Sequence, residues 1–164
     1  MQTLDPETSQ QMFTKCAEGL TVWCGRRYVA GLASGEKTMA EGAEIMARLA
    51  DGRCADERSV IEALRPVLNI LLVSTHTSYV LHQESCACLS PHENALLLGQ
   101  RELQMDNTET FRRLMSSVLP AAAIREIQGP MAELAAAMLR LQAHYAQQFF
   151  RDNHHIRPAD AVIH

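Results

Sequence analysis

Aromatic residues, lysine and long apolar runs are all scarce in this chain of 164 residues. Phe, Trp and Tyr make up only 5% of the sequence, so the apolar volume of a core must come from Leu, Ala and eight Met residues. Ala, Leu and Met are strong helix formers, whereas aromatic and β-branched residues favour strands. The composition therefore predicts an all-α protein.

Without a long apolar run, the sequence offers no candidate for a membrane-spanning helix. The longest run, residues 67–73, is far shorter than the roughly 20 residues that cross a bilayer. The first seven residues lack the basic and apolar regions of a secretory signal peptide. Five cysteines, an odd number, are not typical of a secreted disulfide scaffold. We therefore expect a cytoplasmic protein with reduced thiols and no membrane partner.

An excess of positive charge is also lacking, since the formal net charge is −4. A general attraction to nucleic acid is therefore not expected. Two basic pairs, Arg26-Arg27 and Arg112-Arg113, could contact phosphate or an acidic partner, but such pairs are usually solvated helix faces. With Lys15 and Lys37 as the only lysines, the Ala- and Arg-rich composition is typical of proteins from GC-rich bacterial genomes.

Familiar catalytic motifs are missing as well. The sequence contains no G-x-S-x-G, P-loop or G-x-G-x-x-G pattern, and no Glu-x-x-His pair of the kind that binds di-iron centres. The strongest candidate for an enzyme pocket is the hydroxyl-rich segment around His76 and Tyr79. Ser and Thr within a helix usually bond to the carbonyl of the preceding turn, however. An enzyme with a pocket near His76 is thus the weakest of the functions considered.

Helix start and stop signals divide the first half of the chain into three helices. The first should run from about Pro6 to Ala33, and the second from a capping box at residues 38–41 to Asp51-Gly52. A third, capped by Asp56, should bend or split at Pro66, because proline disrupts a helix interior. Beyond that proline it is apolar on nearly all sides, which predicts a central position, and it should continue towards His82.

The second half should add three or four helices. A capping box at Ser90–Glu93 begins one that reaches about Met105, and residues 106–109 begin the next. A short Ala-rich helix should follow Pro120 and end at Gly129-Pro130, where the last helix begins. We expect a single-domain helical bundle of about six to seven helices over residues 1–152, with a flexible tail at residues 153–164. Its core should be the third and last helices, wrapped by the first.

The most informative stretch is residues 82–92, which read H-x3-C-x-C-x3-H. Sulfur and imidazole donors suit zinc or another transition metal. If the third helix reaches Cys86, then His82 and Cys86 share one face, and a helix corner could gather four metal ligands: His82, Cys86, Cys88 and His92. A redox pair is the alternative, and ordinary packing of small apolar Cys side chains is a third. The one-residue gap argues against both sulfurs binding one ion, and a C-x-C disulfide would close a very tight ring.

Because no catalytic motif is present, the leading hypothesis is a small regulatory protein that binds a protein partner through its helical surfaces. Met-rich faces and a long first helix also favour a homodimer. The alternative is a metal- or redox-responsive protein that uses the Cys/His stretch. No cofactor is implied beyond that zinc or other transition metal.

Overall fold

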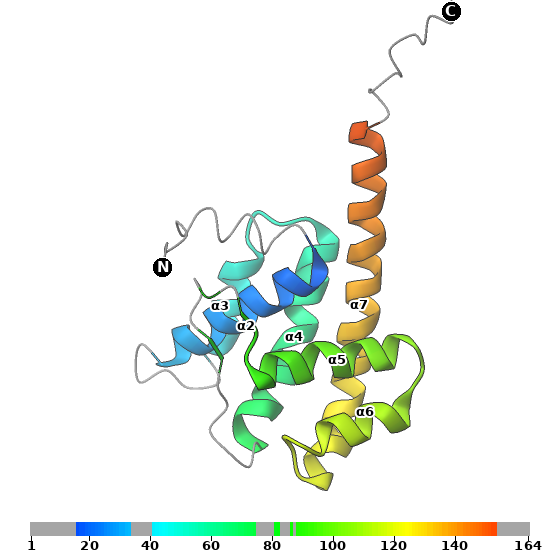
Figure 1. Ribbon diagram of the computed structural model, residues 1–164. Coiled ribbons are helices and arrows are strands. Elements are labelled where there is room, and N and C mark those ends of the chain that lie inside the picture. Colours follow the sequence, from blue (N-terminus) through cyan, green and yellow to red (C-terminus); the bar gives the residue numbers. More distant parts are fainter. Residues whose placement is uncertain (1–15, 34–40, 75–80, 83–85, 87, 154–164) are drawn as a thin grey trace, which may run out of the picture.

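The structure, a computed structural model, describes residues 16–33, 41–74, 81–82, 86 and 88–153 (Figure 1). Within these residues 83% of the chain is helical and no strand occurs, which confirms the all-α class. None of the helices described is long and apolar enough to cross a membrane. The helices are α2 (Ala17–Ala33), α3 (Gly42–Ala50), α4 (Ala55–Ser74), α5 (Pro91–Gln104), α6 (Thr108–Met115) and α7 (Ala121–Asn153).

The centre of the bundle is the packing of α4 against α7, as the sequence predicted. Helices α2 and α3 pack on each other and on α4, while α5 packs on both α6 and α7 (Figure 1). Large apolar side chains of α4 and α7 are almost completely buried where the two helices meet. They recur every three or four residues, the spacing of one helix face. We call this set the α4–α7 seam: Leu64, Val67, Leu68, Leu71, Met131, Leu134, Met138 and Leu141.

Neither internal proline divides its helix. Helix α7 runs unbroken through Gly129-Pro130, so the predicted pair of helices is wrong there, and α4 is not split at Pro66. An internal proline costs about 3 kcal/mol or more. On both sides of Pro130, however, Ile127 and Met131 are fully buried, and each such side chain contributes about 1.5–3 kcal/mol. Packing therefore outweighs the local signal.

Most of the other predicted helix ends that the structure describes agree with the sequence. Helix α2 ends at Ala33, and α3 ends before Gly52, whose φ of 71° suits glycine after a helix. Helix α4 begins two residues earlier than a cap at Asp56 implies, and the Glu57 carboxylate accepts a hydrogen bond from the Cys54 backbone N–H at 3.2 Å. The predicted start of the first helix at Pro6, the cap at Thr38 and the tail from residue 154 onward lie outside the described residues.

Candidate metal and thiol site

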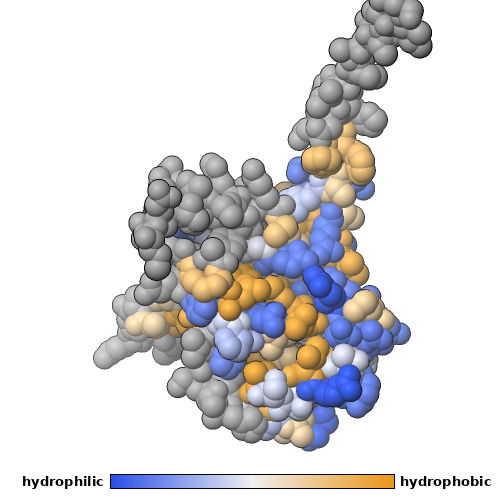
Figure 2. All heavy atoms as spheres, in the orientation of Figure 1, coloured by the Kyte–Doolittle hydropathy of each residue, from blue (hydrophilic) through white to orange (hydrophobic). Residues whose placement is uncertain are grey.

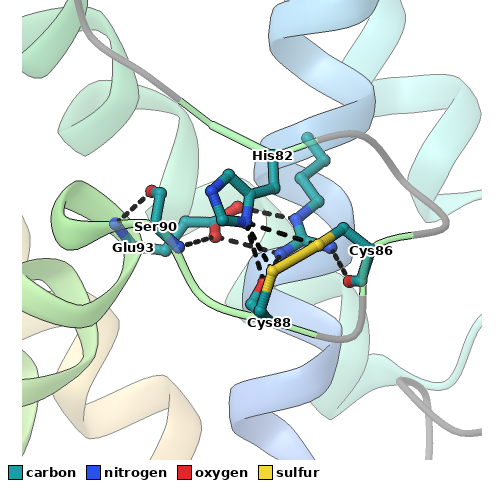
Figure 3. A network of polar contacts seen from close by, with 6 residues as sticks. His82, Cys86, Cys88, Ser90 and Glu93 are labelled. Atoms are coloured by element: carbon teal, nitrogen blue, oxygen red, sulfur yellow. Dashed lines mark hydrogen bonds and ion pairs between the residues drawn. A yellow bond between two sulfur atoms is a disulfide. The ribbon is translucent and has the colours of Figure 1, made fainter.

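Three of the four predicted metal ligands converge before the start of α5. His82, Cys86 and Cys88 each offer one donor atom, and these atoms all lie within 4.8 Å of one another. The His82 Nδ1 atom is 3.4 Å from the Cys86 sulfur and 3.0 Å from the Cys88 sulfur (Figure 3). His82 and Cys86 are half-buried, whereas Cys88 is exposed. We call this group, with Ser90 and Glu93, the corner.

In the structure the sulfurs of Cys86 and Cys88 form a disulfide (Figure 3). Their Cα atoms lie 5.5 Å apart, within the usual range for a disulfide of 4.4–6.8 Å. The one-residue spacer, which the sequence argument counted against pairing, is therefore compatible with it. Cys16, Cys24 and Cys54 have free thiols.

The predicted helical placement of these ligands is wrong. Helix α4 ends at Ser74, and the described residues Leu81, His82 and Cys86 belong to no helix. Their backbone groups bond to side chains instead of to a helical turn: the His82 N–H donates to Glu93, and the Cys86 carbonyl accepts from an arginine. His82 and Cys86 are thus positioned by their backbone contacts with the buried side chains of Glu93 and Arg26, and not by a shared helix face.

His92, the fourth predicted ligand, is not part of this group. It lies in the first turn of α5, and the donor cluster in the described part of the chain contains only His82, Cys86 and Cys88. The pocket hypothesis around His76 and Tyr79 concerns residues outside the described ranges.

A buried arginine from α2 holds the loop in place. Arg26 is 3% exposed, and its Nε donates to Glu93 Oε1 at 2.6 Å while its Nη2 donates to Glu93 Oε2 at 3.0 Å. The same guanidinium donates to the Cys86 carbonyl at 2.6 Å and to the Cys88 carbonyl at 2.7 Å. One planar group therefore fixes the backbone of both cysteines and the first turn of α5.

Sequence reasoning missed this role, since it treated Arg26-Arg27 as a solvated pair. Arg27 is exposed as expected, but Arg26 is buried. A signal was present: Arg26 follows Val22 by four residues and precedes Val29 by three, so it lies on an apolar stripe of the helix. A charged residue on such a stripe calls for a buried partner, although the stripe does not say which residue that is.

Glu93 serves two purposes at once. It completes the predicted capping box, since its carboxylate accepts from the Ser90 backbone N–H at 2.7 Å and its own N–H donates to the Ser90 hydroxyl at 3.1 Å. Burial by itself would raise the pKa of Glu93. Hydrogen bonds from Arg26 and from the backbone of Ser90 and His82 outweigh that effect, so the pKa of Glu93 is lowered. The carboxylate is therefore ionised and neutralises Arg26.

The two sulfurs and the His82 nitrogen can take part in two kinds of chemistry. As thiolates, the two sulfurs and the His82 nitrogen form an S₂N donor set, which suits Zn²⁺ and other soft ions. As a disulfide, the sulfurs are unavailable to a metal. The His82 Nδ1 atom also lies 3.1 Å from the Cys88 carbonyl oxygen. It can donate a proton to that oxygen or offer a lone pair to a metal, but not both at once.

Comparisons with protein-family models, with curated proteins and with solved structures found no match to this chain.

Proposed function

We propose that this is a small regulatory protein that binds a soft metal ion, with Zn²⁺ as the test ion, through His82, Cys86 and Cys88 in the reduced state. The observation that supports this most strongly is the convergence of three soft donors within 4.8 Å. The residues lie on no common helix, and hydrogen bonds from Arg26 to the carbonyls of both cysteines position them.

The surroundings of the donors favour an exchangeable ion over a permanently enclosed one. Three protein ligands leave one position of a tetrahedral zinc ion open, and Cys88 faces solvent. The ligands are nevertheless held from behind, because Arg26 binds the carbonyls of both cysteines. Outer hydrogen bonds of this kind orient metal ligands. Binding and release of the ion would therefore act on the contact between the loop and α2.

The test uses the full chain, purified without an affinity tag and reduced under anaerobic conditions. We expect one Zn²⁺ per chain in a competition assay with a chelating dye. Absorption spectroscopy of the bound ion should give zinc–sulfur distances of about 2.3 Å and a zinc–nitrogen distance of about 2.0–2.1 Å. At a free Zn²⁺ concentration of 100 times Kd, the folded state gains about 2.7 kcal/mol. A chelator should lower Tm accordingly.

Matched variants separate a site from adventitious binding. Cys86→Ser, Cys88→Ser and His82→Ala should each lose the ion, whereas Cys54→Ser and His92→Ala should keep it. His92→Ala is the sharper control, because the sequence pattern includes His92 and the described donor cluster does not. If the melting curve of the protein isolated from cells is unchanged by chelator, and added Zn²⁺ does not bind, the metal proposal fails.

Binding to a second copy of the chain is a second candidate function, and an exposed stripe on α7 favours it. Apolar residues follow one another on α7 with the 4-3 spacing of a helix–helix seam, and all of them are exposed: Ala132, Ala136, Leu139, Ala143, Ala146 and Phe150. Phe150 and its neighbour Phe149 are 64% and 66% exposed, at the end of α7 that extends beyond the other helices (Figures 1 and 2).

Charges beside the stripe suit an antiparallel pair of α7 helices. Glu133 and Arg140, seven residues apart on α7, both flank the stripe. In an antiparallel pair centred between them, each acid would face the base of the other copy. Sedimentation should show a dimer at tens of micromolar, consistent with mass action. Leu139→Glu should give a monomer, while Gln148→Glu, which adds the same negative charge away from the stripe, should not. A monomeric wild type would rule out this candidate.

A further inference from the structure

The two cysteines of the corner differ in exposure to solvent. Cys88 is exposed and Cys86 is half-buried, although the two belong to one disulfide. An attacking thiolate must approach one sulfur from solvent, and exposure decides which sulfur it reaches. The buried Arg26 holds both backbones from the protein side, with its carbonyl contacts at 2.6 and 2.7 Å. The open approach is therefore to Cys88.

We propose that the Cys86–Cys88 disulfide exchanges with a low-molecular-weight thiol, and that Cys88 is the sulfur that is attacked. The incoming thiolate forms a new bond to the Cys88 sulfur, the Cys86–Cys88 bond breaks, and Cys86 leaves with the electron pair as a thiolate. A second thiolate then attacks the small-molecule sulfur of this mixed disulfide and releases Cys88 as a thiolate. In total, two thiols are oxidised to one small disulfide, and the protein disulfide gains two electrons and becomes a dithiol.

His82 is the residue that responds to the change. In the disulfide form its Nδ1–H can donate to the Cys88 carbonyl, 3.1 Å away. The same atom lies 3.0 Å from the Cys88 sulfur and 3.4 Å from the Cys86 sulfur, so it can donate to the thiolate of Cys86 when that sulfur departs and to that of Cys88 once the dithiol has formed. Movement of one hydrogen bond from oxygen to sulfur therefore stabilises the leaving group without rebuilding the loop.

The exchange itself does not depend on the proposed metal function; only its effect on metal binding rests on that function. The disulfide and the metal need the same two sulfurs, so reduction of the disulfide by the thiol would create the metal site and oxidation would expel the ion. The regulatory input would then be the thiol redox state, and the bound ion would report it.

The primary experiment traps the mixed disulfide in the wild-type chain. The oxidised protein is treated with a limiting amount of glutathione, quenched with acid and analysed by peptide fragmentation mass spectrometry. We expect the adduct on Cys88. An adduct mainly on Cys86 would overturn the assignment, and a disulfide that glutathione does not open would overturn the exchange itself.

Two matched variants measure the rates with one thiol at a time. Cys86→Ser leaves the Cys88 thiol, and Cys88→Ser leaves the Cys86 thiol; each is made with Cys16→Ser and Cys54→Ser so that other accessible thiols do not react. With oxidised glutathione, we expect Cys88 to form the mixed disulfide about tenfold faster than Cys86, because access to the sulfur limits the rate. Equal or reversed rates in variants with wild-type circular dichroism would contradict the proposal.

Zinc binding distinguishes the two proposals. If Cys88 forms the adduct but reduced protein binds no Zn²⁺, the exchange stands and the metal function falls. If reduced protein binds Zn²⁺ but glutathione opens no disulfide, the reverse holds. If both stand, Zn²⁺ should bind the reduced protein and not the oxidised one.

Discussion

The α4–α7 seam and the corner are stabilised in different ways. In the seam, many large apolar side chains of α4 and α7 are buried, so the stabilisation is spread over many contacts. At the corner, the guanidinium of Arg26 bonds to the Glu93 carboxylate and to the carbonyls of Cys86 and Cys88, at distances of 2.6–3.0 Å. Packing that is distributed over many side chains can compensate for a local disruption, which is why Pro66 and Pro130 do not break their helices. A buried charge with few partners should not tolerate the loss of one of them.

Replacement of Arg26 by methionine should have the largest effect. Arg26→Met keeps much of the apolar stem but leaves Glu93, 1% exposed, without its counter-charge. Removal of one partner from a buried pair costs about 3–5 kcal/mol. Urea unfolding measures the loss. Arg27→Met is the matched control, because Arg27 is exposed and stacks on Trp23 at 5.5 Å, a contact worth about 0.5–1 kcal/mol.

A double variant tests the cause of this loss. Arg26→Met with Glu93→Leu removes both charges, so the cost of an unpaired buried carboxylate disappears and part of the stability should return. If Arg26→Met costs no more than Arg27→Met, the corner is not the more fragile region and the comparison with the seam is wrong.

A truncation in the seam should cost nearly as much but leave the corner intact. Leu134 of α7 is fully buried, and Leu→Ala substitutions at such positions cost about 2–5 kcal/mol. Leu139→Ala on the same helix is the control, because Leu139 is 47% exposed. The folded Leu134→Ala protein should keep the zinc stoichiometry and glutathione reactivity of the wild type. A change in either would show that the two regions are coupled.

Cys24 is completely buried, whereas Cys86 is half-buried and Cys88 is exposed. Burial raises the pKa of Cys24 to about 12; Arg53 opposes this rise and Glu57 adds to it. The folded state thus holds this proton more tightly than the unfolded state. The stabilisation is fully present below the ordinary thiol pKa of 9.0, and it is lost as the pH rises from there towards 12. The pKa values of Tyr28 and Tyr145 are also raised by burial, so their contributions have the same sign.

We therefore expect the free energy of unfolding to fall above pH 9, by up to about 1.4 kcal/mol per pH unit for Cys24 alone. Urea unfolding between pH 8 and 10 measures the slope. Cys24→Val should reduce it. Equal slopes for wild type and variant would mean that the thiol proton is not the source, and rapid alkylation of Cys24 in the folded protein would contradict its burial.

What the sequence could predict depends on the distance between interacting residues along the chain. The start of α5 was predictable because the hydrogen bonds of Ser90 and Glu93 join residues three apart. The ion pair of Arg26 with Glu93 was not, since 67 residues separate the two and no local pattern names the partner. The continuity of α7 likewise depends on packing against other helices on both sides of Pro130.

The candidate site was likewise predictable only where its residues lie close together in the sequence. Residue types and spacing singled out His82, Cys86 and Cys88, because soft donors close in sequence are rarely far apart in space. They were assigned to a helix face, however, because the apolar pattern of α4 was extended beyond its end at Ser74. Arg26, which the local sequence does not contain, binds the carbonyls of Cys86 and Cys88, and so the geometry could not be derived from residues 82–92 alone.

Replacement of Gly129 by alanine should have the smallest effect, and a stabilising one. In an unbroken α7 this glycine is an exposed interior helix residue, and a Cβ atom added to it meets nothing within 4 Å outside its chain neighbours and the backbone of its own helix. Glycine in a helix costs about 0.5–1 kcal/mol relative to alanine, and the Pro130 ring opposes part of this gain because it crowds the Cβ of the preceding residue, so Gly129→Ala should raise the free energy of unfolding by less than that amount. Gly99→Ala in α5 is the control: its Cβ would lie 3.2 Å from the Met115 sulfur and 3.3 Å from the Phe111 ring, so crowding should cancel the gain. Urea unfolding compares the two. If Gly129→Ala destabilises the protein, the chain at Gly129-Pro130 needs the freedom of glycine, and the two-helix arrangement that the sequence predicted would replace the continuous α7.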